Sequence, residues 1–100
     1  MYKVTVLYEH PTDPDAFEKH FKEHHLPLAQ AMARMSRIEI TRFETSADGG
    51  KPAYYRMAEI FFTSKQVMEE TMGSPEGQAT INDLHNLTTT GVKILLGNVE

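Results

Sequence analysis

Hydrophobic and polar residues alternate along residues 2–8, and this pattern predicts a β-strand. One side of that strand carries Tyr2, Val4, Val6 and Tyr8. Strand-like runs also cover residues 36–45, 53–62 and 92–99. The cluster Asp48-Gly49-Gly50-Lys51-Pro52 separates the second run from the third and predicts a hairpin loop, so these two strands should pair antiparallel.

Three signals mark the starts of helices in the remaining intervals. Asp13 followed by Pro14 predicts an N-cap with proline at the first helical position. Thr63 followed three residues later by Gln66 resembles a capping box that opens a helix towards Gly73. Ser74-Pro75 restarts a helix, whose apolar side should consist of Ile81, Leu84 and Leu87.

The first helix contains a proline in its second half. Pro27 has no amide hydrogen, and in a straight helix its ring would clash with the carbonyl of Glu23. We therefore predict a break near His25, followed by a short helical piece to about Met35. Before and after the break, the apolar stripe should be formed by Phe17, Phe21 and Leu28.

The resulting order, β-α-β-β-α-β, is that of the ferredoxin-like split βαβ fold, an α+β architecture with a four-stranded antiparallel sheet and its helices on one face. No linker or low-complexity segment interrupts the chain, so residues 1–100 should form a single domain. Both faces of the sheet carry apolar residues, while two helices cover only one face. The uncovered face then predicts a homodimer, against the alternative of scattered surface hydrophobes.

Composition narrows the function classes. The formal net charge is -4 with no run of basic residues, which disfavours nucleic acid or an anionic membrane as a partner. There is no cysteine, so disulfides and cysteine-based zinc sites are excluded. The alternating N-terminus does not resemble a signal peptide, and no stretch is long and apolar enough for a membrane span, so we expect a cytoplasmic protein.

Adjacent histidines are the main candidates for chemistry. On a regular helix His24 lies closer than His25 to the apolar stripe, although the break could turn both rings towards a gap between helix and sheet. A neutral imidazole there could act as a general base or acid, and the structural alternative is a helix-terminal or surface histidine. His20 and His24, four residues apart, could share a metal, but no third ligand is evident and we predict no metal site.

Glu59 is unusual because it lies in the middle of an apolar strand, on the face predicted for Tyr55 and Met57. It could have a raised pKa and transfer protons, or pair with Arg42 or Arg56 across the sheet. Phosphate-binding loops, nucleophile elbows and cysteine nucleophiles are absent from the sequence.

Several stretches resemble the EthD-like family of dimeric α/β barrel proteins: YKVTVLY, HHLPLA, PAYYRMAEIFF, SPEGQATINDL and GVKILLGNVE. The most specific are the step His25-Leu26-Pro27-Leu28 and the helix start Ser74-Pro75-Glu76-Gly77. Relatives often carry a Pro-Gly pair before the second strand, where this chain has Ala33-Arg34-Met35-Ser36. The resemblance implies a homodimer whose two sheets close a barrel, and a pocket in each subunit lined by His25 rather than His24.

Together these observations predict a small cofactor-independent enzyme that acts on a small hydrophobic, oxygenated compound by isomerisation, cyclisation or oxygen insertion. His25 would move a proton, assisted by Tyr55 or Glu59, in a pocket bounded by Tyr8, Tyr55 and Met57 with His24 beside the substrate. The first alternative is a non-catalytic accessory that binds a hydrophobic metabolite or an oxygenase partner. A less favoured alternative is haem binding by a histidine.

Overall fold

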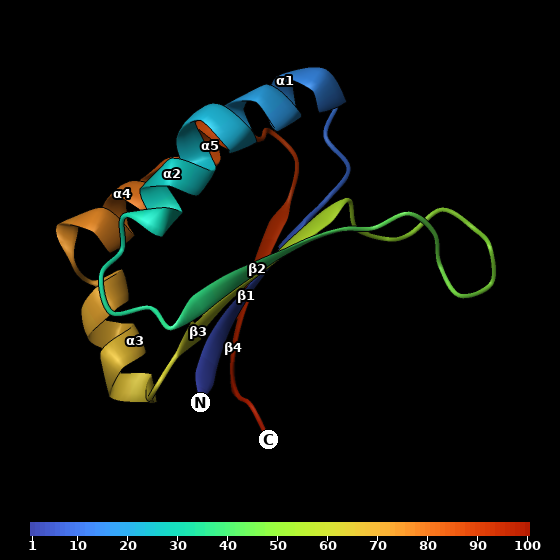
Figure 1. Ribbon diagram of the computed structural model, residues 1–100. Coiled ribbons are helices and arrows are strands. Elements are labelled where there is room, and N and C mark those ends of the chain that lie inside the picture. Colours follow the sequence, from blue (N-terminus) through green and yellow to red (C-terminus); the bar gives the residue numbers. More distant parts are fainter.

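A computed structural model describes all residues, 1–100, and contains one four-stranded sheet in the order β2-β3-β1-β4, with every neighbouring pair antiparallel (Figure 1). The strands are β1 (Tyr2–Tyr8), β2 (Arg37–Arg42), β3 (Arg56–Phe62) and β4 (Val92–Asn98). The helices are α1 (Pro14–His20), the π-helical η1 (Phe21–His25), α2 (Leu26–Gln30), α3 (Lys65–Met72), α4 (Pro75–Asn82) and α5 (Leu84–Leu87). The predicted ferredoxin-like plan is confirmed, with all helices on one side of the sheet.

Alternation along the strands divides the sheet into two faces. Val4 of β1 pairs with Ile60 of β3 and with Leu96 of β4, and Ile60 in turn pairs with Ile38 of β2. These side chains face the helices, where they meet Phe17, Phe21, Ala29 and Met68 in the core. None of the helices is long and apolar enough to cross a lipid bilayer.

The first helical region does not break at the proline. The backbone stays helical from α1 through η1 into α2, and the Leu26 amide donates to the carbonyl of Phe21 in a π turn. A π turn contains one extra residue, which widens the helix where a regular turn would bring the Pro27 ring against the carbonyl of Glu23. The predicted end was also wrong, because α2 stops at Gln30 instead of about Met35.

Helix caps follow the sequence signals with one correction. Asp13 caps α1 by accepting from the Ala16 amide, and Ser74 caps α4. The helix predicted to be capped by Thr63 is capped by Ser64 instead, which accepts from the Val67 amide. The expected reciprocal bond from Gln66 is therefore not formed, and its amide donates to Glu70 one turn later.

The connection to β2 contains Ala33-Arg34-Met35-Ser36 where relatives often carry a Pro-Gly pair. Arg34 has a φ of 73°, the one non-glycine residue of the chain in the left-handed region, where glycine is favoured. Its guanidinium forms an ion pair with Glu70 of α3 at 2.5 Å. The left-handed position before β2 is thus occupied by an arginine whose side chain pairs with a neighbouring helix.

The outer face of the sheet is less apolar than the alternation predicts. Phe61 points to this face but is only 5% exposed, because the Arg37 guanidinium lies over its ring at 3.9 Å and Lys3 lies nearby. The large apolar residues that remain exposed belong to β4 or adjoin it: Met1, Ile94, Leu95, Leu96 and Val99. Ile94 and Leu96 lie on the inner side of β4, because both line the space between sheet and helices, so the uncovered apolar surface follows both sides of this edge strand.

Candidate active site

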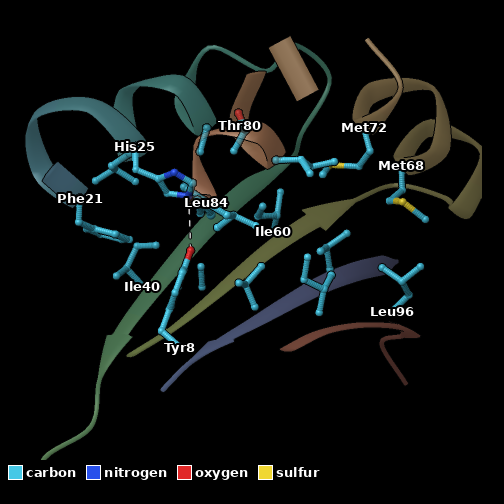
Figure 2. A pocket seen from close by; sticks show the side chains of 18 residues that line it. Tyr8, Phe21, His25, Ile40, Ile60, Met68, Met72, Thr80, Leu84 and Leu96 are labelled. Carbon is cyan, nitrogen blue, oxygen red and sulfur yellow. Dashed lines mark hydrogen bonds between the residues drawn. The ribbon is translucent and has the colours of Figure 1, made fainter. Parts of the chain in front are cut away.

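A cavity of about 200 Å³ lies between the helices and the inner face of the sheet (Figure 2). It is lined by eighteen residues, of which sixteen are apolar, and none of them is Lys, Arg, Asp or Glu. The sheet contributes the floor, and η1, α2, α3, α4 and α5 contribute the walls, including Met68, Met72, Ile81 and Leu84. The few polar side-chain atoms of the lining belong to Tyr8, His25 and Thr80.

His25 reaches this cavity because of the π turn. A four-residue repeat on an α-helix drifts by about 40° at each step, and the extra residue of a π turn counteracts that drift. Phe17, Phe21, His25 and Ala29, spaced by four, are accordingly all buried. His24, which regular periodicity placed on the stripe, is exposed instead. The structure thus agrees with the resemblance in placing His25, not His24, at the cavity.

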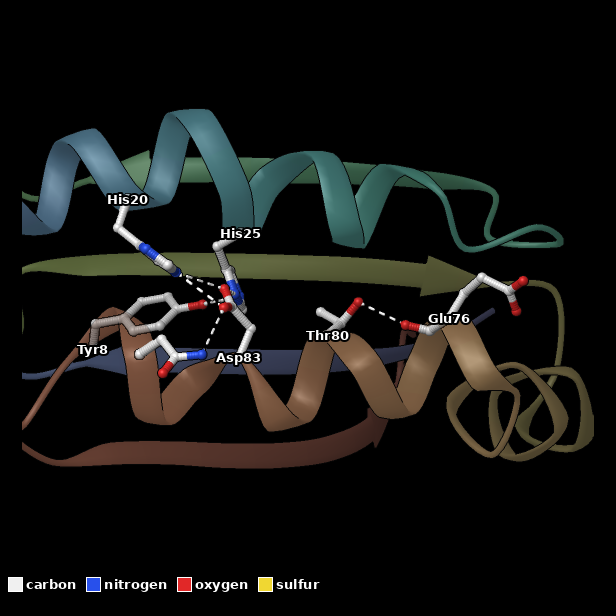
Figure 3. A network of polar contacts seen from close by, with 7 residues as sticks. Tyr8, His20, His25, Glu76, Thr80 and Asp83 are labelled. Carbon is white, nitrogen blue, oxygen red and sulfur yellow. Dashed lines mark hydrogen bonds and ion pairs between the residues drawn. The ribbon is translucent and has the colours of Figure 1, made fainter.

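Both ring nitrogens of His25 face polar groups. Nε2 lies 3.4 Å from the Tyr8 hydroxyl, and Nδ1 lies 2.9 Å from Oδ2 of Asp83 (Figure 3). Asp83 is 8% exposed and also accepts from His20 Nε2, at 2.9 and 3.0 Å to its two oxygens. Asn86 adds a weaker contact of 3.3 Å to the same carboxylate. A buried carboxylate therefore holds the imidazole from the side opposite the cavity.

Burial and hydrogen bonding set the charge states of this group. Burial lowers the pKa of His25 below its ordinary value, although the hydrogen bond to Asp83 acts in the opposite direction. Burial would raise the pKa of Asp83, but hydrogen bonds from His25, His20 and Asn86 outweigh it and leave that pKa lowered. At neutral pH, Asp83 is ionised and His25 is neutral. Nδ1–H then donates to the carboxylate and Nε2 carries a lone pair towards the cavity.

Tyr8 completes the polar end of the cavity. It is 1% exposed, and burial raises the pKa of its phenol, which stays protonated at neutral pH. Its hydroxyl can donate to His25 Nε2 or to a group of a bound molecule. The cavity thus has one acceptor and one donor side by side, a combination suited to proton transfer next to an oxygen atom.

Asp83 was missed by the sequence analysis. It is the residue between α4 and α5, and the buried residues Thr80, Asp83 and Leu87 share one helical face. A carboxylate on a buried face is unusual, because burial costs free energy unless the charge is hydrogen-bonded. That spacing is the signal by which the residue could have been found.

Four residues proposed from the sequence lie outside this cavity. Glu59 and Met57 are on the outer face of the sheet, because alternation in β3 opposes them to Ala58 and Ile60. Glu59 pairs with Lys3 at 2.7 Å, rather than with either arginine suggested by the sequence. Met57 therefore does not bound the cavity, although the sequence predicted that it would. Glu59 lies too far from the cavity side of the sheet to transfer a proton to a molecule bound there.

Tyr55 and His24 also lie outside the cavity, each for a different reason. Tyr55 precedes β3 and escapes its alternation, so the ring packs on the helix side against Phe17 in a separate cluster. Its hydroxyl is buried without a hydrogen-bond partner, next to the Arg56–Glu18 ion pair rather than in the cavity. His24 lies at the surface, with its ring 5.1 Å from that of His20.

Comparison with known proteins identifies close relatives over the whole chain. Residues 9–89 match the model of the EthD domain. An uncharacterized 11.0 kDa protein from the thcB-thcC intergenic region of Rhodococcus erythropolis is 37% identical, over 100% of this chain and 96% of its own length. A crystal structure of an ethyl tert-butyl ether degradation (EthD) family protein from Bacillus halodurans is 26% identical with a TM-score of 0.94, covering 100% and 99% of the two chains.

More distant structures share the fold at low identity. A dimeric protein of unknown function with a ferredoxin-like fold from Bacteroides fragilis has a TM-score of 0.69 at 16% identity, with 98% and 95% of the chains covered. SnoaB, a cofactor-independent oxygenase from Streptomyces nogalater, has a TM-score of 0.64 at 16% identity over 98% and 90%. A hydroxynitrile lyase from Passiflora edulis has a TM-score of 0.77 at 10% identity over 99% and 93%.

Proposed function

This chain belongs to the EthD domain family, and on that premise we propose that it is a small enzyme that transfers a proton on an apolar, oxygenated compound without a cofactor. One observation carries the proposal. A neutral imidazole faces an apolar cavity while a buried carboxylate holds its other nitrogen, at 2.9 Å between His25 Nδ1 and Asp83 Oδ2. The oxygenase and the lyase among the structural neighbours support the idea that this fold can hold an active site.

The chemistry follows from the geometry. Nε2 of His25 removes a proton from a carbon next to a carbonyl group, so a C–H bond breaks, an N–H bond forms and the electron pair moves onto the carbonyl oxygen. The Tyr8 hydroxyl donates to that oxygen, and Asp83 stabilises the imidazolium. Return of the proton to another carbon gives isomerisation, and attack of the carbanion on an internal carbonyl gives cyclisation. Reaction of the carbanion with O₂ would give oxygenation.

In this proposal Asp83 takes the supporting role that the sequence assigned to Tyr55 or Glu59. The outer-face position of Glu59 separates it from the cavity by the sheet itself. Tyr55 contacts Phe17 and His10 instead of the cavity. Tyr8 remains the hydroxyl that contacts the substrate.

Replacing His25 by Ala and, as a matched control, His24 by Ala tests the proposal. The measurement is exchange of the α-protons of a small neutral ketone in D₂O, which needs only the first step of the reaction. We expect His25→Ala to slow exchange by about 100-fold or more, because general-base catalysis contributes on the order of 10² to 10⁴. His24→Ala should leave it unchanged. Equal exchange by His25→Ala and the wild type, both folded by circular dichroism, contradicts the mechanism.

A binding protein of an oxygenase pathway is the second candidate, because the apolar lining alone can hold such a compound. It predicts that a ligand raises the melting temperature while the α-proton exchange rate stays at the uncatalysed value. An oxygenase partner would then be sought by pull-down with the full chain as bait.

We also propose that two copies pack together at β4. The exposed Leu95 lies on the outer side of this edge strand, because alternation opposes it to Ile94 and Leu96, which line the cavity on the inner side. The exposed Val99 is joined to Met1 by a backbone hydrogen bond of 2.9 Å. The dimeric neighbour of the same fold supports the formation of a dimer. Sedimentation should give a dimer at micromolar concentration for the wild type and a monomer for Leu95→Asp.

A further inference from the structure

We propose, building on the proposed function, that the molecule bound in the cavity is an electrically neutral ketone or aldehyde of about the size of a substituted benzene ring. Its carbonyl group would lie at the deep end beside Tyr8 and His25. Its hydrocarbon part would lie between Met68, Met72 and Leu96 at the other end (Figure 2).

Charge is the first argument. No Lys or Arg lines the cavity, so a carboxylate or phosphate would find no cation there. The nearest arginine of the inner face, Arg56, is already held by Glu18, with 2.8 Å between Arg56 Nε and Glu18 Oε2. Behind His25 lies the ionised Asp83, which repels a second negative charge. A buried, unpaired anion is costly, so these surroundings select a neutral ligand.

The distribution of polar atoms is the second argument. The Tyr8 hydroxyl and His25 Nε2 lie 3.4 Å apart at one end of the cavity. The Thr80 hydroxyl already donates to the carbonyl of Glu76, at 2.9 Å, and offers no donor to a ligand. Towards Met68 and Met72 the lining is apolar, and their flexible side chains can follow different hydrocarbon shapes. A ligand with one hydrogen-bonding group at one end can therefore pair with the available polar atoms of the lining, while the rest of the ligand contacts apolar side chains.

The volume of the cavity and the position of its opening indicate the size of the ligand and the direction of its entry. A cavity of about 150 Å³ is large enough to bind benzene, so about 200 Å³ accommodates one ring with a short substituent. Ile94 and Leu96 line the cavity but are 46% and 55% exposed, whereas Tyr8 and His25 are 1% and 5% exposed. The opening is thus at the apolar β4 side, and a ligand enters with its carbonyl group first.

Three probes of matched size test this inference: phenylacetone, phenylacetate and propylbenzene. Binding to the full chain is followed at pH 7.5 by the chemical shifts of the His25 ring. We expect phenylacetone to bind about tenfold or more tightly than phenylacetate, which has no cation to pair with. It should also bind several-fold more tightly than propylbenzene, which leaves the Tyr8 hydroxyl without a ligand partner.

Tyr8→Phe should remove the preference for the ketone over the hydrocarbon, while Tyr54→Phe, outside the cavity, should preserve it. Equal or tighter binding of phenylacetate overturns the inference, and so does a ketone preference that survives Tyr8→Phe. The result is separable from the proposed function: phenylacetone that binds without exchanging its α-protons contradicts catalysis and leaves the ligand class intact. Exchange of an anionic compound alone would contradict the ligand class and leave catalysis intact.

Discussion

The two faces of the sheet each hold one conspicuous carboxylate, and their surroundings give them different properties. Asp83 lies on the helix side, buried, and accepts hydrogen bonds from two imidazoles beside an apolar cavity. Glu59 lies on the outer face and forms an ordinary ion pair with Lys3, whose side chain is 33% exposed. A carboxylate becomes useful for proton transfer where water is excluded and an imidazole is held in one tautomer, and only the inner face offers both.

The largest expected effect is on activity. Asp83→Asn should slow the α-proton exchange by about 100-fold or more, because an amide no longer stabilises the imidazolium or fixes the Nδ1–H tautomer. Glu59→Gln removes the same charge from the outer face and should change the rate by less than about twofold. The comparison fails if the two variants lose activity equally while both remain folded.

Adjacent phenylalanines offer a comparison in stability. Phe62 points inward and is 0% exposed, so Phe62→Ala should lower the free energy of unfolding by about 3–5 kcal/mol. Phe61 points outward under Arg37 and Lys3, and Phe61→Ala should cost about half as much, because long polar side chains can settle over the gap. Urea denaturation at one fixed protein concentration measures both. A larger loss for Phe61→Ala would show that the outer face is the better packed one.

Activity and stability should both depend on pH through His25 and Asp83 of the inner face. Because the pKa of His25 is lowered, activity should persist below the ordinary histidine value of about 6.5 and be lost as pH falls through the folded pKa. Between these values the unfolded chain binds more protons, so stability also decreases on acidification. The pKa of Asp83 is also lowered, so its ionised form stabilises the folded chain at pH values above its unfolded pKa of about 3.9. This stabilisation is lost as pH falls through the folded pKa of Asp83. Exchange rates from pH 4 to 8 should show the His25 trend, and unfolding midpoints from pH 2 to 8 should show both trends. An acid limb of activity above the ordinary histidine value would contradict a buried neutral base.

The smallest expected effect concerns His20, which holds Asp83 from the solvent side and whose side chain is 25% exposed. His20→Ala should reduce the exchange rate by about fivefold, since a partly exposed hydrogen bond contributes on the order of 1 kcal/mol. His20→Gln should restore most of it, because the amide can donate to Asp83 without titrating. Nitrogen NMR of the His25 ring in both variants reports the tautomer, and an unchanged tautomer population in His20→Ala would show that His20 does not position Asp83.

Much of the fold could be predicted because it depends on local chemistry. The alternation in β1, the Asp13 and Ser74 caps and the glycine-containing hairpin loop each act within a few residues, and all are found in the structure. The Thr63 capping box failed because Ser64, one residue later, competes for the same role.

The candidate site was only partly predictable, because its members come from three separate elements. Residue patterns and family resemblance together led to Tyr8 and His25, but periodicity alone favoured His24, since it contains no information about a π turn. Met57 and Glu59 were misplaced because one wrong face assignment moves a side chain to the opposite side of a sheet. Tyr55 lies on the helix side but before β3, where it packs against Phe17 outside the cavity.

The sequence alone was enough to predict the main strands and helices, their order and the alternation along each strand, because hydrophobic periodicity and caps are properties of neighbouring residues. Tertiary structure decided which histidine faces the cavity and which carboxylate supports it. Asp83 is 58 residues from His25 along the chain, and only the packing of the first helical region against the α4–α5 junction brings their side chains within 2.9 Å. A site assembled from such distant residues depends on the packing of whole elements, which no local pattern encodes.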